Sequence, residues 1–223
     1  MLTTQQIEDN KTKFLNLITN INREGSDIEG LVRWLTERSD FFTAPASTKY
    51  HSAFEGGLCN HSLNVYNNLV ELVKLFASPM KLVEYMDDKG EVEFAEIKPV
   101  PLYSEDSLKI VALFHDISKA NFYKMGIRNV KNEQTGKWEQ VERYEIRDTS
   151  ERFIYGNHEQ NSEFMIHSFI PLSVEEASAI LHHHAGMSWD CTQVDISTIY
   201  NKYTLATLIH LADMAACYIL EKI

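Results

Sequence analysis

A histidine and an aspartate stand next to each other inside an apolar run, at positions 115 and 116. The run reads Val-Ala-Leu-Phe-His-Asp-Ile over residues 111–117. Burying two ionisable side chains among such residues costs free energy unless a partner compensates for it. Imidazole and carboxylate groups both ligate divalent cations such as Mn, Fe and Zn. The pair therefore indicates a metal site.

Further imidazoles and carboxylates recur along the chain, each on or at the end of an expected helix with apolar flanks. Side chains placed in this way can converge on a metal in the core of a helical bundle. A single histidine is more often a packed or surface residue, so the joint pattern carries the hypothesis. The candidates are His61, His115, Asp116, His158, the run His182–His184, and Asp213.

The spacing of apolar residues predicts that most of the chain is helical. Two segments break the helical pattern, and each predicts a β-hairpin because turn residues separate short apolar runs: Met80–Tyr103 and Ile127–Ile146. The second hairpin lies between two ligand segments, and it is either a flap over the site or a surface insertion. The expected helices cover 4–22, 28–37, 58–77, the segment from Ser104 through Asp116, 158–170, 173–184 and 197–221.

The composition is that of a soluble globular protein, with 44% hydrophobic and 24% charged residues among 223. The net charge of −11 argues against tight, nonspecific binding to duplex DNA. It does not exclude a phosphorylated substrate, since a metal can supply local positive charge. Three separated cysteines, Cys59, Cys191 and Cys217, suit a reducing cytosol. Without a signal peptide or a long apolar stretch, we expect a cytoplasmic protein that does not contact a membrane.

The order and flanks of the candidate ligands resemble the HD-domain metal-dependent phosphohydrolases, over about residues 44–216. Tyr50-His51 followed by Gly56-Gly-Leu-x-x-His61 is similar to a motif of the branch that includes 3′–5′ exoribonucleases. The HDxxK core of the family is matched by His115-Asp-Ile-Ser-Lys119. The later family segments are matched by Gly156-Asn-His158-Glu, with one inserted residue, by Ile180-Leu-His-His183-His184, and by Leu211-Ala-Asp213.

This resemblance implies a single domain, residues 1–223, with an all-α HD-type helical bundle at 44–216. An N-terminal helical extension (1–43) and a β-hairpin insertion near 127–146 complete it. The resemblance also implies one or two divalent ions, drawn from Mn, Fe, Mg, Ni or Zn. His61, His115, Asp116 and Asp213 would hold one ion, and Asp116 would bridge to a second ion held by His158 and His183.

In such a site Asp116 and Lys119 are the expected catalytic residues, and Lys119 lies one helical turn after Asp116. It would orient that carboxylate or neutralise a substrate phosphate. His51 and His184 would contact substrate or support the metal ligands. The register of the run leaves open which of His182, His183 and His184 is the ligand.

The implied reaction is hydrolysis of a phosphoester by a metal-activated water. Two substrate classes stay open: a single-stranded nucleic-acid end, or a nucleotide or other phosphorylated small molecule. Basic residues of the second hairpin are candidate phosphate contacts, although alternating glutamates favour ordinary solvated charge: Arg128, Lys131, Lys137 and Arg143. The third alternative is a non-hydrolytic, metal-bearing regulatory or interaction module. The sequence leaves the oligomeric state open.

Overall fold

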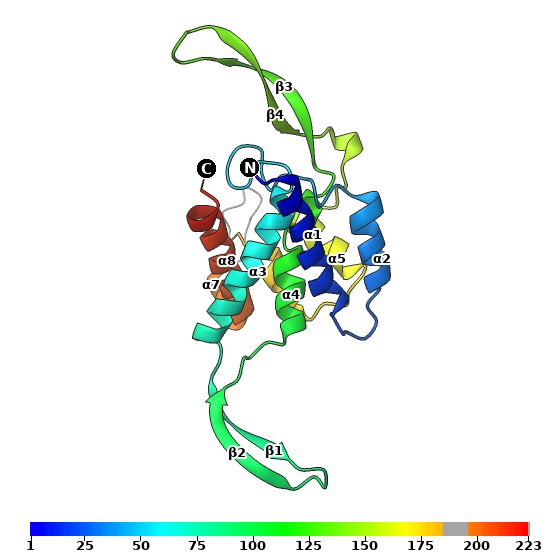
Figure 1. The fold of residues 1–223 in the computed structure, drawn as a ribbon, viewed down its shortest axis with the longest axis vertical. Coiled ribbons are helices and arrows are strands. Elements are labelled where there is room, and N and C mark those ends of the chain that lie inside the picture. Colours follow the sequence, from blue (N-terminus) through cyan, green and yellow to red (C-terminus); the bar gives the residue numbers. More distant parts are fainter. Residues whose placement is uncertain (185–195, 223) are drawn as a thin grey trace.

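The computed structural model describes residues 1–184 and 196–222, and it has a helical body from which two β-hairpins project at opposite ends (Figure 1). Four one-turn segments accompany the helices: π-helical Trp34–Arg38 and Ala216–Leu220, and 3₁₀-helical Ile117–Lys119 and Thr149–Glu151. The α-helices are α1 (Thr4–Thr19), α2 (Ile28–Arg33), α3 (Gly57–Phe76), α4 (Glu105–Phe114), α5 (His158–His167), α6 (Val174–Leu181), α7 (Ile196–Lys202) and α8 (Thr204–Ala215).

The expectation of an all-α fold is wrong, because two separate antiparallel sheets accompany the helices. Strand β1 (Met80–Met86) pairs with β2 (Val92–Pro99), and β3 (Tyr123–Lys131) pairs with β4 (Trp138–Ile146). Both hairpins follow the predicted turn chemistry, since Gly90 and Gly136 adopt φ angles of 81° and 68° that favour glycine. The chain is therefore a mixed helical and β protein. The hairpin expected near 127–146 begins already at Tyr123.

The N-terminal segment 1–43 packs into the same apolar core as the remaining helices. Phe14 of α1 is fully buried, and its ring lies 4.9 Å from Phe41, 5.7 Å from Phe42 and 5.7 Å from Phe114 of α4. Aromatic rings at such separations stabilise a core beyond their buried area. Helix α1 thus supports α4, the helix that ends at the His115-Asp116 pair.

The helix expected at 197–221 is interrupted, which corrects that prediction. Tyr203 adopts an extended conformation with φ −124° and ψ 94°, so that α7 ends before it and α8 begins after it. No glycine or proline marks the break in the sequence. Among residues 1–184 and 196–222, no single helix is long and apolar enough to cross a membrane; α7 and the segment Thr204–Leu220 meet such a test only as a pair bent by 110°. Cys191 lies outside the described residues, and Cys59 and Cys217 are free.

Helix α6 begins at a capping box and is attached to the chain before α2 by an ion pair. The Ser173 side chain accepts from the backbone N–H of Glu176, and the Glu176 side chain accepts from that of Ser173. Arg23 donates to both carboxylate oxygens of Glu176, over 2.6 and 2.7 Å, and the Glu176 side chain is only 3% exposed. Bidentate pairs of this kind are strong and geometrically specific.

Glu176→Gln should lower the free energy of unfolding by about 3 kcal/mol, because Arg23 loses its charged partner. For a domain of this size that loss corresponds to a melting temperature lower by roughly 6–12 °C. Burial alone would raise the pKa of Glu176, but the hydrogen bonds from Arg23 outweigh it and lower the pKa. The difference from wild type should therefore be complete at neutral pH and shrink as the pH falls through the folded-state pKa.

Thermal unfolding followed by circular dichroism measures this effect. Glu24→Gln is the matched control, since Glu24 is exposed and stands next to Arg23. An equal loss in both variants would contradict the importance of the Arg23–Glu176 pair.

Candidate metal centre

Five elements each bring one part of the candidate site to the middle of the helical body. Asparagine 157, the inserted residue, caps α5 through a hydrogen bond with the Gln160 backbone, and it places His158 in the first turn of that helix. The loop before α3 packs closely on the helix, because a Cβ on Gly57 would lie 2.0 Å from the Ser52 carbonyl oxygen. The site residues come from α3 (His61), the end of α4 (His115, Asp116), α5 (His158), the end of α6 (His183, His184) and α8 (Asp213).

The first group of ligand atoms surrounds His61, which is fully buried. Its Nε2 lies 3.1 Å from Asp213 Oδ1 and 3.3 Å from His115 Nε2. The Nδ1 of His115 donates to the Ala112 carbonyl over 2.8 Å, and this hydrogen bond directs the Nε2 of His115 towards His61. Ligand atoms of His61, His115 and Asp213 all lie within 4.8 Å of one another, as a shared cation requires.

The second group lies on the other side of Asp116 and consists of His158, His183 and His184. Their ligand atoms also lie within 4.8 Å of one another. Asp116 Oδ1 lies 3.7 Å from Nε2 of His158 and 3.7 Å from Nε2 of His183. Asp116 Oδ2 faces the first group, at 3.7 Å from His61 Nε2 and 3.5 Å from His115 Nε2. One carboxylate thus stands between two sets of imidazoles.

Three atoms of this centre are buried without a hydrogen-bond partner among the described residues: Asp116 Oδ1, His158 Nε2 and His183 Nε2. Buried polar atoms are almost always hydrogen-bonded, and an exception is explained by a bound water or ion. The three atoms converge on each other. Each can offer a lone pair to a divalent cation, as metal ligands do. The residues therefore fit a divalent metal ion, which these three atoms could hold together.

The electrostatics prepare several of these groups for cation binding. Burial lowers the pKa of His115 and of His158 to about 3, so both imidazoles are neutral at neutral pH, the state that ligates metals. Burial would also lower the pKa of His61, but hydrogen bonds to Asp213 and Glu221 outweigh it and raise that pKa to about 10. In the metal-free protein, a proton on His61 therefore offsets part of the negative charge of Asp213 and Glu221.

The ammonium group of Lys119 donates a hydrogen bond to Oδ2 of Asp116. Its Nζ lies 2.6 Å from Asp116 Oδ2, and the Lys119 side chain is 12% exposed. Burial alone would lower the pKa of Lys119, but the charge of Asp116 outweighs it and raises that pKa. The permanently charged ammonium fixes the rotation of the carboxylate and leaves Oδ1 for His158 and His183.

Two carboxylates that the sequence reasoning missed orient the histidines. Glu159 Oε1 accepts from Nδ1 of His184 over 2.9 Å; its Oε2 lies 3.1 Å from Nδ1 of His158 but has no hydrogen-bond partner among the described residues. Glu221 lies 3.2 Å from Nδ1 of His61 and also accepts from Asn64. Carboxylates in this position fix the tautomer and the direction of metal-binding imidazoles.

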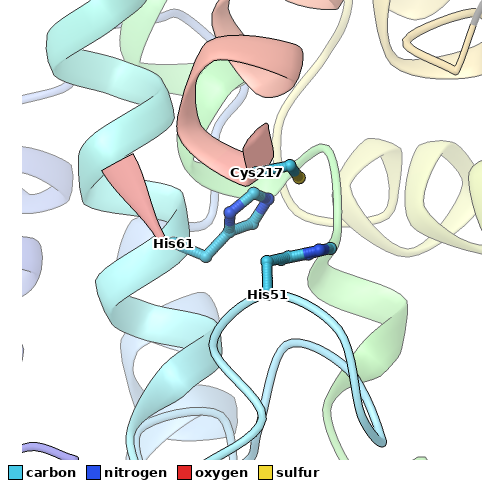
Figure 2. A group of neighbouring side chains, drawn as sticks. All are labelled: His51, His61 and Cys217. Carbon is cyan, nitrogen blue, oxygen red and sulfur yellow. The ribbon is translucent and has the colours of Figure 1, made fainter. Parts of the chain in front are cut away.

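The signal for Glu221 was present in the sequence as a helical spacing. Asp213, Cys217 and Glu221 follow one another at intervals of four residues, which places them along one helical face. Cys217 Sγ donates to Asp213 Oδ1 over 3.3 Å. Figure 2 shows Cys217 beside His61 and His51, with His51 reaching in from the loop before α3.

The structure brings most of the candidate site residues together. The six expected ligands, His61, His115, Asp116, His158, His183 and Asp213, come together around Asp116, as does Lys119. The His184 ring reaches the second group, and the His51 ring lies 4.8 Å from that of His61. His182 instead directs its Nδ1 to the Ser178 carbonyl, 2.8 Å away. Arg128 and Arg143 of the β3–β4 hairpin line a separate pocket, whose lining contains none of the candidate ligands.

Glu159→Gln should weaken metal binding about 10- to 100-fold, because an amide nitrogen or a neutral oxygen would replace the anionic acceptor of the His184 imidazole. Isothermal titration of the chelator-treated protein with Mn²⁺ measures the affinity. Glu163→Gln is the matched control on the same helix, since the Glu163 carboxylate pairs with the exposed His167 rather than with a candidate ligand. Equal affinities for Glu159→Gln and wild type would show that Glu159 does not support the centre.

Comparisons of the chain with protein-family models, with curated proteins and with solved structures find no match. A functional proposal for this chain therefore rests on its own residues and their geometry.

Proposed function

We propose that this protein is a divalent-metal-dependent phosphohydrolase of the HD-domain type, acting on a nucleotide or nucleic-acid phosphoester. The observation that carries the proposal is the convergence of Asp116 Oδ1, His158 Nε2 and His183 Nε2, all buried and all without a hydrogen-bond partner in the part of the chain that the structure describes. A second set of ligand atoms, from His61, His115 and Asp213, supports two adjacent ion sites rather than one.

His61, His115, Asp213 and Asp116 would hold one ion, and Asp116, His158, His183 and His184 would hold the other. When bound, two such ions neutralise a phosphoryl group and lower the pKa of a water nucleophile. The protein supplies the fixed arrangement, because buried side chains with hydrogen-bonded Nδ1 atoms do not reorient during the reaction.

Lys119 is a positioning residue in this proposal. Its contact with Asp116 Oδ2 keeps the carboxylate between the two groups of imidazoles. His51 is the candidate for a substrate contact, because its Nε2 is buried with no hydrogen-bond partner among residues 1–184 and 196–222 and its ring lies beside His61. An imidazole in this place can donate to a phosphoryl oxygen or to a leaving oxygen.

The test is hydrolysis of a phosphodiester, bis(p-nitrophenyl) phosphate, and a phosphomonoester, p-nitrophenyl phosphate, with each candidate divalent metal. We expect turnover with at least one metal, its loss in EDTA and its return after metal is restored. The preferred substrate separates a diesterase from a nucleotidase. Stoichiometric metal binding with no hydrolysis of either compound, nor of nucleotides or oligonucleotides, would contradict the proposal and favour a regulatory module.

A further inference from the structure

A pocket of about 390 Å³ lies between the base of the β3–β4 hairpin and the loop before α3. The hairpin and this loop rise from the same end of the helical body (Figure 1). Four cationic side chains line the pocket, from Lys49, Lys124, Arg128 and Arg143, together with the acidic Glu145 and Asp148. This local excess of positive charge stands out in a chain of net charge −11.

The strand register gathers three of these cations on one face of the hairpin. Lys124 and Arg128 are separated by an even number of residues along β3, so their side chains leave the same face. Arg143 of β4 pairs with Gly126, midway between them, and therefore points to that face as well. Lys131 and Lys137, towards the hairpin tip, do not line the pocket.

The acidic neighbours satisfy only part of this charge. Lys124 lies 3.2 Å from Asp148 and 3.2 Å from Glu151, and Arg128 Nε lies 4.0 Å from Glu145. Neither Lys49 nor Arg143 has an ion-pair partner within residues 1–184 and 196–222. Unpaired cations around a hollow attract an anion, because low-dielectric walls focus their field.

The pocket is next to the candidate metal centre. Lys49 lines the pocket, and His51, two residues further on, lies beside His61. Two residues span at most about 7 Å. Between them stands Tyr50, whose side chain is 68% exposed and whose ring lies 5.1 Å from Lys49 Nζ. Exposed aromatic rings beside cations are the arrangement on which single-stranded bases stack.

We propose that this pocket binds the phosphate backbone of a single-stranded oligonucleotide. The further statement, that the bound strand is the substrate of the neighbouring metal centre, rests on the proposed function. The pocket is too small and its cations too few for the many phosphate contacts of a duplex. The side chains of Lys49, Arg128 and Arg143 contact phosphates, and Tyr50 stacks on a base.

Fluorescence anisotropy with a short fluorescein-labelled oligouridylate, in EDTA and at low salt, tests the proposal. The charge-reversal pair Arg128→Glu/Arg143→Glu should weaken binding at least about tenfold and reduce the salt dependence. Lys131→Glu/Lys137→Glu makes the same change of charge at the hairpin tip and should retain wild-type affinity within about twofold. Equal losses in both pairs, or none in the first, would overturn the proposal.

Two further measurements identify the ligand of the pocket and separate a failure of the pocket proposal from a failure of the proposed function. Tyr50→Ala should also weaken oligouridylate binding, and inorganic tripolyphosphate should compete poorly with the oligouridylate for the pocket. If tripolyphosphate competes efficiently and Tyr50→Ala has no effect, the pocket binds free phosphate chains instead. Since binding is measured without metal, it reports on the pocket even if the centre proves inactive. Hydrolysis of bis(p-nitrophenyl) phosphate, in turn, tests the centre without using the pocket.

Discussion

Asp116→Asn should abolish metal-dependent phosphoester hydrolysis, with kcat falling by more than about 100-fold. Side chains that only orient a ligand typically cost 10- to 100-fold when they are removed. The Asp116 carboxylate lies within 3.7 Å of imidazole nitrogens from both groups, so its loss affects both ion sites. Elemental analysis should show that the variant binds less metal, and bis(p-nitrophenyl) phosphate turnover measures the lost activity.

Folding has to be checked in this variant, because Lys119 loses its charged partner in a nearly buried position. Circular dichroism and thermal unfolding provide the check. Asp88→Asn is the matched control, since Asp88 is exposed on the turn of the β1–β2 hairpin. If folded Asp116→Asn protein kept full metal content and activity, Asp116 would not be the shared ligand.

His183→Ala should reduce the bound metal by one ion per chain and eliminate most hydrolysis. His183 is fully buried, and its Nδ1 donates to the Ile180 carbonyl over 2.7 Å, so only Nε2 is available for a cation. The first group does not include this residue, and it should retain its ion. Elemental analysis and the phosphodiester assay, performed on the same preparation, measure the two effects.

His167→Ala is the control for the loss of an imidazole, since the His167 side chain is 54% exposed and contacts Glu163 at the end of α5. Its metal content and activity should equal those of wild type. Loss of both ions in folded His183→Ala protein would mean that the two groups do not bind independently.

The sequence predicted the parts of this structure that local patterns determine. The hairpins were recognisable because turn residues separate short apolar runs, and the structure forms both of them. The candidate ligands were recognisable because imidazoles and carboxylates interrupt apolar helical segments, where an unpartnered polar group is costly. The structure brings these side chains together around Asp116.

Features that depend on tertiary packing were missed. The break at Tyr203 has no local signal, because its extended backbone accompanies the packing of α8 into the core rather than a turn residue. Glu159 and Glu221 are two among 32 acidic residues, and only the fold shows that they meet His184 and His61. The all-α expectation failed because the hairpin near 127–146 was treated as an insertion in a helical fold, although it and the β1–β2 hairpin each form a sheet of their own.

The most direct test of the proposed centre is elemental analysis of the full-length protein, purified without chelator and without exposure to a nickel affinity resin. The two groups around Asp116 predict a content near two divalent ions per chain. A content near one would contradict the two-ion arrangement. No bound ion, even after reconstitution with Mn or Fe, would contradict the metal centre itself.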